Sequence, residues 1–310
     1  MQTRLTDILE IEHPVMLAGM GGVSYHAVVS AVSEAGGFGC LGASTMGQLK
    51  MVEEIAAVRA LTDMPFGVDL LTAAPGDMPA QVQAVIDGGA RVFVAGLGVP
   101  RDVIEQCHAA NVLVVNMCGK VRHATAAVAA GCDIVVAQGT EAGGHTGQVA
   151  TMALVPQVVD AVGDQVPVVA AGLALGADGV WMGTRFIATP EARAVPGYKD
   201  ALLAIGEDGT VITRGYTGKT CRVVRNAYTQ YWESHTDEVQ PFPAQFIRSM
   251  NDGANHLGAD EHTPDIDPDR EFWPAGQGAG AMHELIPAGD LVRQIVAEAE
   301  AALARVATLT

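Results

Sequence analysis

Residues 133–147 read Asp-Ile-Val-Val-Ala-Gln-Gly-Thr-Glu-Ala-Gly-Gly-His-Thr-Gly. The apolar run predicts a buried strand, and the glycine-rich loop after it carries one histidine, His145. Parallel α/β enzymes present backbone N–H groups and acid–base side chains in such loops. Gly143 and Gly144 lack a Cβ, which lets the backbone approach a flat ligand and adopt positive φ. We therefore interpret His145 as a proton donor or acceptor beside a ligand; the alternative is a tight turn with a surface histidine.

Similar apolar runs recur along the first 183 residues and predict parallel strands. They lie at 15–19, 37–41, 66–71, 92–96, 113–117, 134–138, 168–172 and 179–183. Alanine-rich amphipathic segments at 26–35, 47–61, 79–87, 100–110 and 121–130 predict helices between them. This alternation predicts an α/β fold of the (β/α)8 TIM barrel type, with an open doubly wound sheet as the alternative.

One interval is too short for this scheme. Only residues 173–178 separate the seventh and eighth runs. A crossover between parallel neighbours needs roughly a dozen residues, usually a helix. We therefore expect about ten residues to be missing after Gly172, either deleted from the protein or left out of the sequence.

The pattern changes after the eighth run. Segments 199–205 and 222–233 are predicted helical, 210–220 forms a possible hairpin, and 290–306 is predicted as a terminal helix. Segment 234–280 is acidic and rich in glycine and proline, so we expect loops over the barrel mouth without a core of their own. The expected domains are a barrel at 1–189, also packed by the helix at 290–306, and a helical and loop region at 190–289 that acts as a lid or substrate region.

Composition narrows the class of protein. The 310 residues are 49% hydrophobic and carry a net charge of −17, which argues against nucleic acid or an anionic membrane surface as partner. The five cysteines are scattered without a C-x-x-C pair, which predicts reduced, buried thiols. No signal peptide or membrane-spanning run is recognisable, so we expect a cytoplasmic protein.

Several strand ends carry groups suited to a phosphate-bearing ring system. Ala171 and Gly172 follow the seventh strand, and Gly183 and Thr184 follow the eighth, where barrels often bind phosphate. The first strand is followed by a glycine-rich stretch that begins with Gly19 and Met20, and its backbone can face a planar ligand. Asp69 and Gln138 end the third and sixth strands and could hydrogen-bond a heterocycle. Each feature taken alone is equally consistent with an ordinary loop or a polar strand end.

Other kinds of site have weaker signals. Residues 256–262 contain two histidines and two carboxylates but lack a helical H-E-x-x-H pattern, so we interpret them as a solvated loop and expect no metal site. We find no nucleophile elbow, no P-loop and no convincing dinucleotide fingerprint. Tyr228, Tyr231 and Trp232 are expected to pack in a core or lid.

The chain resembles the nitronate monooxygenase family of FMN enzymes over about residues 5–189. The matching pieces are Glu-His-Pro-Val-Met at 12–16, Ala-Gly-Met at 18–20, Ala-Gly-Gly-Phe-Gly at 35–39, Thr-Asp-Met-Pro-Phe-Gly-Val at 62–68, Glu-Ala-Gly-Gly-His at 141–145 and Met-Gly-Thr-Arg-Phe at 182–186. A weaker echo is Gly-Gln-Gly-Ala-Gly at 276–280. The same set is similar to the flavin-dependent enoyl-acyl-carrier-protein and acyl-CoA reductases.

The resemblance implies FMN across the barrel mouth, with its phosphate held by Gly172, Gly183 and Thr184. Its ring and ribityl chain would contact Gly19, Met20, Asp69, Gln138, Gly143, Gly144, Trp181 and Met182, and His145 would face the substrate. The chain departs from the family pattern in three places. The family has Asn where this chain has Asp69, a Gly-Gly-Ile/Phe-x-Asp-Gly-Arg-like segment is absent after Gly172, and the C-terminal segment diverges.

The leading functional hypothesis is an FMN-dependent oxidoreductase that oxidises alkyl nitronates with dioxygen. The first alternative is an enoyl-thioester reductase that also uses NAD(P)H, so the small-molecule substrate is a nitronate or an acyl thioester. A non-catalytic flavin-binding barrel, and more remotely a phosphosugar isomerase or lyase, also stay open, as does the question of a homodimer.

Overall fold

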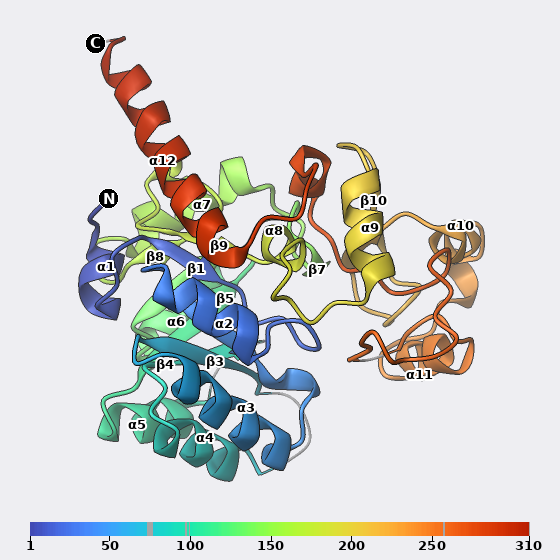
Figure 1. Cartoon of the computed structure of the whole chain (residues 1–310), viewed down its shortest axis with the longest axis horizontal. Helices are drawn as coiled ribbons and strands as arrows, with labels where there is room; N and C mark the ends of the chain where they lie inside the picture. The colour runs from blue at the N-terminus through green and yellow to red at the C-terminus, as the bar shows by residue number, and fades with distance from the viewer. Residues whose placement is uncertain (73–76, 97, 99, 257, 310) are drawn as a thin grey trace.

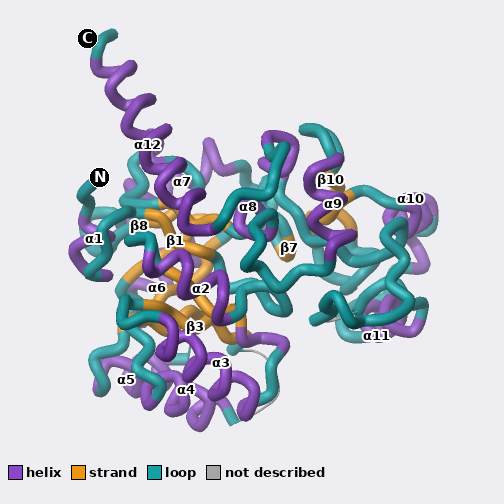
Figure 2. Tube along the Cα trace, in the orientation of Figure 1, coloured by secondary structure: helices purple, strands orange, loops and turns teal. Residues whose placement is uncertain are grey.

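Parallel strands form the centre of the molecule, as the computed structural model shows (Figures 1 and 2). The structure describes residues 1–72, 77–96, 98, 100–256 and 258–309. The barrel strands within these residues are β1(Val15–Leu17), β2(Gly39–Gly42), β3(Phe66–Leu71), β4(Val92–Gly96), β5(Leu113–Cys118), β6(Ile134–Ala137), β8(Val168–Val169) and β9(Val180–Met182). They match the predicted runs in place and order, and several are shorter than predicted.

The strands close into a ring. The ladder β2-β3-β4-β5-β6-β8 is continuous, and β9 pairs with β1 in parallel. Parallel bridges Met16↔Phe38 and Val169↔Gly179 join the two groups. The bond from Leu17 N to Phe38 O measures 2.9 Å, and that from Ala170 N to Gly179 O measures 3.0 Å. The arrangement is the predicted (β/α)8 barrel rather than an open sheet.

Alternation along each strand divides the apolar residues between two layers. In β1, Met16 packs inside the barrel, whereas Val15 and Leu17 pack against the surrounding helices. The interior also receives Leu5 and Leu9 from α1(Arg4–Leu9), so this short helix fills one end of the barrel. Strands buried on both faces explain why the sequence shows continuous apolar runs instead of alternation.

Helices surround the ring as predicted. They are α2(His26–Glu34), α3(Gln48–Leu61), α4(Met78–Asp87), α5(Arg101–Ala109), α6(Val121–Ala130), α7(Thr151–Val162) and the short α8(Thr184–Ile187). The terminal helix α12(Ala288–Ala307) packs its first half on α2 and β1 through Leu291, Val292 and Val296. Its second half extends away from the body (Figure 1).

The connection between β8 and β9 contradicts the expectation of a missing segment. The 3-10 helix η2(Leu173–Leu175) takes the place of a crossover helix, and Leu175 N donates to Gly172 O at 3.2 Å. Asp178 fixes the return, since its carboxylate accepts from Val168 N at 2.9 Å. With two residues in β8 and three in β9, the chain returns through a connection that contains one 3-10 turn. Closure of the barrel needs no additional chain.

The C-terminal part forms a second layer beside the barrel (Figure 1). Its elements are α9(Pro196–Ala204), β10(Thr210–Thr213), β11(Cys221–Val224), α10(Ala227–Ser234) and α11(Ala244–Asn251), with 3-10 turns η3(Thr236–Glu238) and η4(Gln277–Ala281). The predicted hairpin is present, because β10 pairs antiparallel with β11, but its second strand lies at 221–224, beyond the predicted bounds of 210–220. The strand β7(Gly144–His145), from the loop after β6, extends that sheet by pairing with β11.

Two expectations for this layer are wrong. Residues 222–224 belong to β11, not to a helix, because the apolar side chains of Cys221 and Val223 pack into a core and the backbone pairs on both edges. The helix α10 starts only after Asn226, whose side chain accepts from Thr229 N at 3.0 Å. Segment 234–280 also joins a core, because Ala254 is buried with Tyr228 and Trp232. Of the three aromatic residues expected in a core or lid, Tyr228 and Trp232 are buried, whereas Tyr231 is 43% exposed.

All five cysteines are free and buried, as predicted. Within the described residues, no helix is long and apolar enough to cross a membrane.

Candidate functional site

A cavity of about 920 Å³ lies at the carboxyl ends of the barrel strands and extends under the C-terminal layer. Nearly all of the predicted site residues line it: Gly19, Met20, Asp69, Gln138, Gly143, Gly144, His145, Ala171, Trp181, Met182, Gly183 and Thr184. Gly172 is not among the lining residues, because it turns the chain into η2. The fold therefore brings together groups that are up to 165 residues apart in the chain, from Gly19 to Thr184.

The loop after β6 is fixed by its own polar groups. The Glu141 carboxylate accepts from Thr151 N at 3.0 Å and from Thr151 Oγ1 at 3.0 Å, which ties the loop to the start of α7. The Arg222 guanidinium donates to Thr140 O at 2.9 Å from the C-terminal sheet. Thr146 Oγ1 donates to Gly139 O at 2.9 Å across the loop. His145 is thus presented by a preorganised segment.

One glycine of this loop is required for a reason that was not predicted, and the other adopts the predicted positive φ. A Cβ on Gly143 would lie 2.7 Å from the backbone of Ala275 and Gly276, so this glycine permits close packing of the C-terminal segment. Gly144 has φ of +74°, a conformation that favours glycine. Whether they also face a ligand ring stays a prediction.

His145 stands at the rim, with one ring nitrogen held by a hydroxyl group. Its Nε2 lies 3.0 Å from Thr217 Oγ1. Lys219 O lies 3.1 Å from the same hydroxyl and can accept its proton. With the hydroxyl proton on Lys219 O, Thr217 accepts from Nε2–H and Nδ1 is the basic nitrogen of the ring. Desolvation, and then the charge of Lys219, lower the pKa of His145. The neutral ring is favoured at neutral pH, as a general base requires.

Asp69 is the second titratable group of the cavity predicted from the sequence. Its carboxyl group has no hydrogen-bond partner among the described residues, and burial raises its pKa from 3.8 to about 8. A Cβ on Gly19 would lie 2.2 Å from the Asp69 Cβ, so the bare glycine makes room for this side chain. At neutral pH Asp69 is mainly a neutral acid, which can donate a hydrogen bond as the amide of Asn would.

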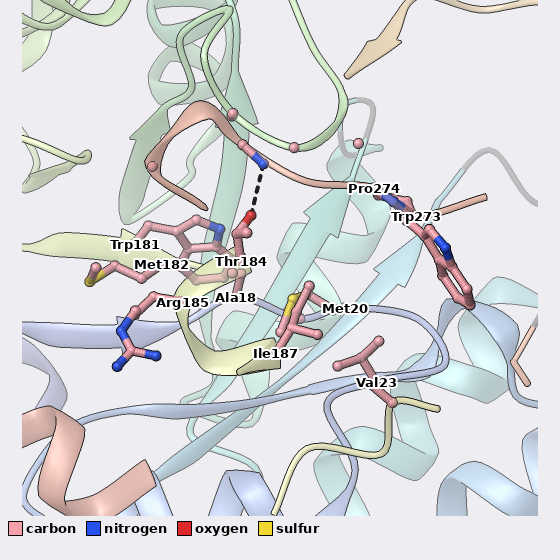
Figure 3. Close-up of a pocket in the computed structure, with 18 of the residues that line it drawn as sticks. Ala18, Met20, Val23, Trp181, Met182, Thr184, Arg185, Ile187, Trp273 and Pro274 are labelled. Atoms are coloured by element: carbon pink, nitrogen blue, oxygen red, sulfur yellow. Dashed lines mark hydrogen bonds between the residues drawn. The ribbon is translucent and has the colours of Figure 1, made fainter. Parts of the chain in front are cut away.

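The ends of β9 and α8 form another wall of the cavity (Figure 3). Thr184 Oγ1 accepts from Gly276 N at 3.0 Å, the bond drawn in Figure 3. The hydroxyl proton of Thr184 finds no acceptor among the described residues. Phe186 N and Ile187 N donate to Gly183 O at 2.8 and 3.3 Å, whereas Thr184 N and Arg185 N have no partner among the described residues. The Arg185 guanidinium lines the same wall, and desolvation lowers its pKa. This wall therefore has unpaired hydrogen-bond donors that are available to bind an anion.

A second histidine at the cavity was not predicted. His256 Nδ1 lies 2.6 Å from Glu271 Oε2, and His256 N donates to Glu271 Oε1 at 2.9 Å. Glu271 is 2% exposed, and both residues line the cavity. The interpretation of 256–262 as a solvated loop is therefore wrong for His256, whereas His262 and Glu261 do face solvent. Leu257, in the same stretch, lies outside the described residues.

No sequence signal identifies this pair. Glu271 is one of several acids in a polar segment, and its spacing from His256 matches no motif. Across the described residues, no group of three or more His, Cys, Asp or Glu side chains is placed to hold a metal ion.

Known proteins are similar to this chain in both sequence and fold. The family model described as nitronate monooxygenase matches residues 2–81 and 75–298. A Mycobacterium tuberculosis protein, (3aS,4S,5R,7aS)-5-hydroxy-7a-methyl-1-oxo-octahydro-1H-indene-4-carboxyl-CoA dehydrogenase, is 39% identical over 246 residues, which cover 76% of this chain and 69% of that protein.

Two solved structures superpose over nearly the whole chain. FabK from Thermotoga maritima aligns with a TM-score of 0.89 and 30% identity, covering 100% of both chains. Nitroalkane oxidase from Streptomyces ansochromogenes aligns with a TM-score of 0.79 and 29% identity, covering 96% of this chain and 99% of the other. The sequence match, the shared barrel and the histidine at its mouth lead to one conclusion: the chain belongs to the nitronate monooxygenase family of flavin-dependent oxidoreductases.

Proposed function

We propose that the protein binds FMN and oxidises alkyl nitronates with dioxygen, giving a carbonyl compound and nitrite. The observation that carries this proposal is the His145 imidazole, held at Nε2 by Thr217 Oγ1, in a loop of the barrel mouth. When bound, FMN would take up the electrons of the substrate and pass them to dioxygen.

The cavity suits FMN in two respects. The Thr184 hydroxyl proton and the backbone N–H groups of Thr184 and Arg185 are free to donate to the phosphate, with Gly183 at the start of that turn. Asp69, as a neutral acid, can donate a hydrogen bond to a carbonyl oxygen of the ring, which an ionised carboxylate could not do. Gly19, Met20, Gln138, Gly143, Gly144, Ala171, Trp181 and Met182 would complete the cofactor-binding surface. Gly172 would contribute only to the shape of the connection.

His145 would act on the substrate and not on the cofactor. A neutral nitroalkane must lose its α-proton before it can react as a nitronate, and the Nδ1 of a neutral His145 can accept that proton. The lowered pKa keeps this nitrogen unprotonated at neutral pH. For a preformed nitronate, no such transfer is needed, and His145 would position the anion.

The region 190–289 would shape the substrate end of the cavity. Trp273 and Pro274 line the cavity, and Trp273 stacks on Tyr198 with ring centroids 4.7 Å apart. Tyr198 in turn donates its hydroxyl proton to Pro274 O. Because this wall comes from the divergent part of the chain, we propose that it sets substrate choice.

A second candidate function is reduction of an enoyl thioester with NAD(P)H. The observation that favours it is the TM-score of 0.89 to FabK, higher than that to nitroalkane oxidase. In this case a hydride would pass from the pyridine nucleotide through the flavin to the substrate.

Anaerobic reduction of the flavin separates the two functions. The purified protein should show flavin absorbance, or acquire it with added FMN. Ethyl nitronate should then bleach the absorbance near the rate of turnover, and NADPH or NADH should not. Rapid bleaching by a pyridine nucleotide, with none by nitronate, would favour the reductase. A protein that binds no FMN would contradict both.

A further inference from the structure

We propose that His256, held by Glu271, forms an anion subsite of the cavity in which Nε2–H donates a hydrogen bond to a negatively charged oxygen of the substrate. The inference rests on the proposed function, because it concerns the same cavity. His256 would determine affinity for the anion, while His145 handles the proton.

The hydrogen bonds fix which nitrogen faces the cavity. Glu271 Oε1 accepts the backbone N–H of His256, and Oε2 accepts from Nδ1. Nε2 has no protein partner among the described residues. A carboxylate that accepts from Nδ1 orients the ring and leaves Nε2 for a ligand, the geometry that enzymes use to aim a histidine.

The Glu271 carboxylate gives the His256 ring a buried acidic partner. Glu271 is 2% exposed, and its two oxygens bond only to His256 among the described side chains. A buried carboxylate without a cation is costly, and an imidazolium neutralises it. The pair is then neutral as a whole, with a positive N–H edge directed outward. Such an edge suits the oxygens of a nitronate.

The loop that carries His256 is held at both ends. Asn255 Nδ2 donates to Ser249 Oγ at 3.2 Å on one side. On the other side the Arg193 guanidinium donates to Gly258 O at 2.6 Å and to Asp260 Oδ2 at 2.6 Å. Arg193 also lies over the Tyr25 ring, with Cζ 4.7 Å from the centroid. Because the loop is already anchored, it loses little conformational entropy when the anion binds.

The loop also lies against the barrel side of the cavity. A Cβ on Gly22 would come within 3.0 Å of Gly258 Cα, so the loop after β1 and the His256 loop are in contact. Gly19 and Met20 belong to the predicted cofactor surface, and Gly21 and Gly22 line the same cavity. A substrate between them could reach His256 and a ring bound over the barrel mouth.

Steady-state kinetics with ethyl nitronate test the subsite. His256→Ala should raise KM by about 10- to 100-fold, the range for one hydrogen bond to a charged group, with kcat within about threefold. His256→Gln, which keeps a neutral donor, should fall between. The matched control is His262→Ala, a histidine of the same loop that is 84% exposed, and it should leave KM unchanged.

His256→Ala leaves Glu271 buried without its partner and could lower stability, so the double variant H256Q/E271Q is measured beside it. That variant replaces the charged pair by neutral amides and should show the intermediate rise in KM expected of His256→Gln, with FMN affinity and Tm close to wild type. An unchanged KM in the folded double variant would overturn the proposal. An equal fall in kcat and in FMN affinity would also overturn it, since that result indicates a structural role.

A binding measurement decides the matter if nitronates are not turned over. Nitrate, a planar anion with the shape of a nitronate head group, is added to protein labelled with 15N-histidine. The Nε2 signal of His256, identified by its loss in H256Q, should move with saturation while that of His262 does not. Failure of turnover with a nitrate-induced shift would contradict only the proposed function. A His256 signal that ignores nitrate would contradict the subsite.

Discussion

The ends of β6 and β8 lie on the same face of one barrel and are built in opposite ways. The loop after β6 is held by three side chains: Glu141 to α7, Arg222 to the loop backbone, and Thr217 to His145. The connection after β8 is a short 3-10 turn with its own backbone bonds, and the Asp178 carboxylate ties its far end to Val168 N. Polar side chains therefore hold the β6 loop around its acid–base group, whereas after β8 a polar side chain fixes the point where the chain returns to the barrel.

Removing the base of the β6 loop should have the largest effect. His145→Gln should lower kcat/KM for neutral nitroethane by about 10²- to 10⁴-fold, the usual contribution of general base catalysis. Ethyl nitronate needs no proton transfer, so its kcat/KM should fall less than about tenfold. Parallel assays of the two substrates measure the difference, and equal losses on both would contradict the role given to Nδ1.

The anchor of the same loop should come next. Glu141→Ala removes the acceptor for Thr151 N and Oγ1 and should lower the free energy of unfolding by about 1–2 kcal/mol. Urea unfolding measures the change. The control Glu261→Ala, at a side chain that is 73% exposed, should stay within about 0.5 kcal/mol. Equal effects of the two substitutions would show that the β6 loop is not specially anchored.

The end of β3 adds a pH-dependent term. Burial raises the pKa of Asp69 from 3.8 to about 8, so the folded state keeps a proton that the unfolded chain releases above pH 4. The stability linked to this group is full below pH 4 and is lost as the pH rises through about 8. Asp69→Asn cannot titrate.

The Tm of wild type should therefore fall relative to that of Asp69→Asn between pH 5 and pH 9. Thermal unfolding of both proteins in matched buffers measures the gap. FMN affinity should diverge in the same direction, because the ionised carboxylate no longer donates. Parallel pH profiles of the two proteins would contradict a neutral Asp69.

The connection after β8 should show the smallest effect. Inserting Gly-Ser between Ala174 and Leu175 lengthens a connection whose side chains make few fixed contacts, and should cost less than about 1 kcal/mol. The same insertion between Thr140 and Glu141 should abolish turnover. Similar losses at both sites would remove the contrast between the two strand ends.

Sequence patterns predicted the parts of the molecule that repeat a simple rule. The apolar runs of β3 and β4 match their predicted bounds, because a strand buried on both faces leaves an uninterrupted apolar stretch. The glycines and His145 marked the β6 loop because they interrupt such a run. The prediction of a helix at residues 222–224 was wrong, because pairing in a small sheet overrode a helical pattern.

The pair His256–Glu271 and the short β8–β9 connection depend on tertiary contacts that no local spacing records. Glu271 differs from the other acids of its segment because it is buried, which the sequence does not show. The two-residue length of β8 decides how far the chain must return. The raised pKa of Asp69 likewise follows from the environment that Gly19 allows, which the residue type alone does not reveal.

Titration of the apoprotein with FMN, followed by anaerobic addition of nitroethane to wild type and His145→Gln, tests the central claim most directly. We predict one FMN per chain, bleaching of the flavin by nitroethane in wild type, and bleaching at least a hundredfold slower in the variant. A protein that takes up no FMN, or a variant that is bleached as fast as wild type, would contradict a flavin bound beside His145.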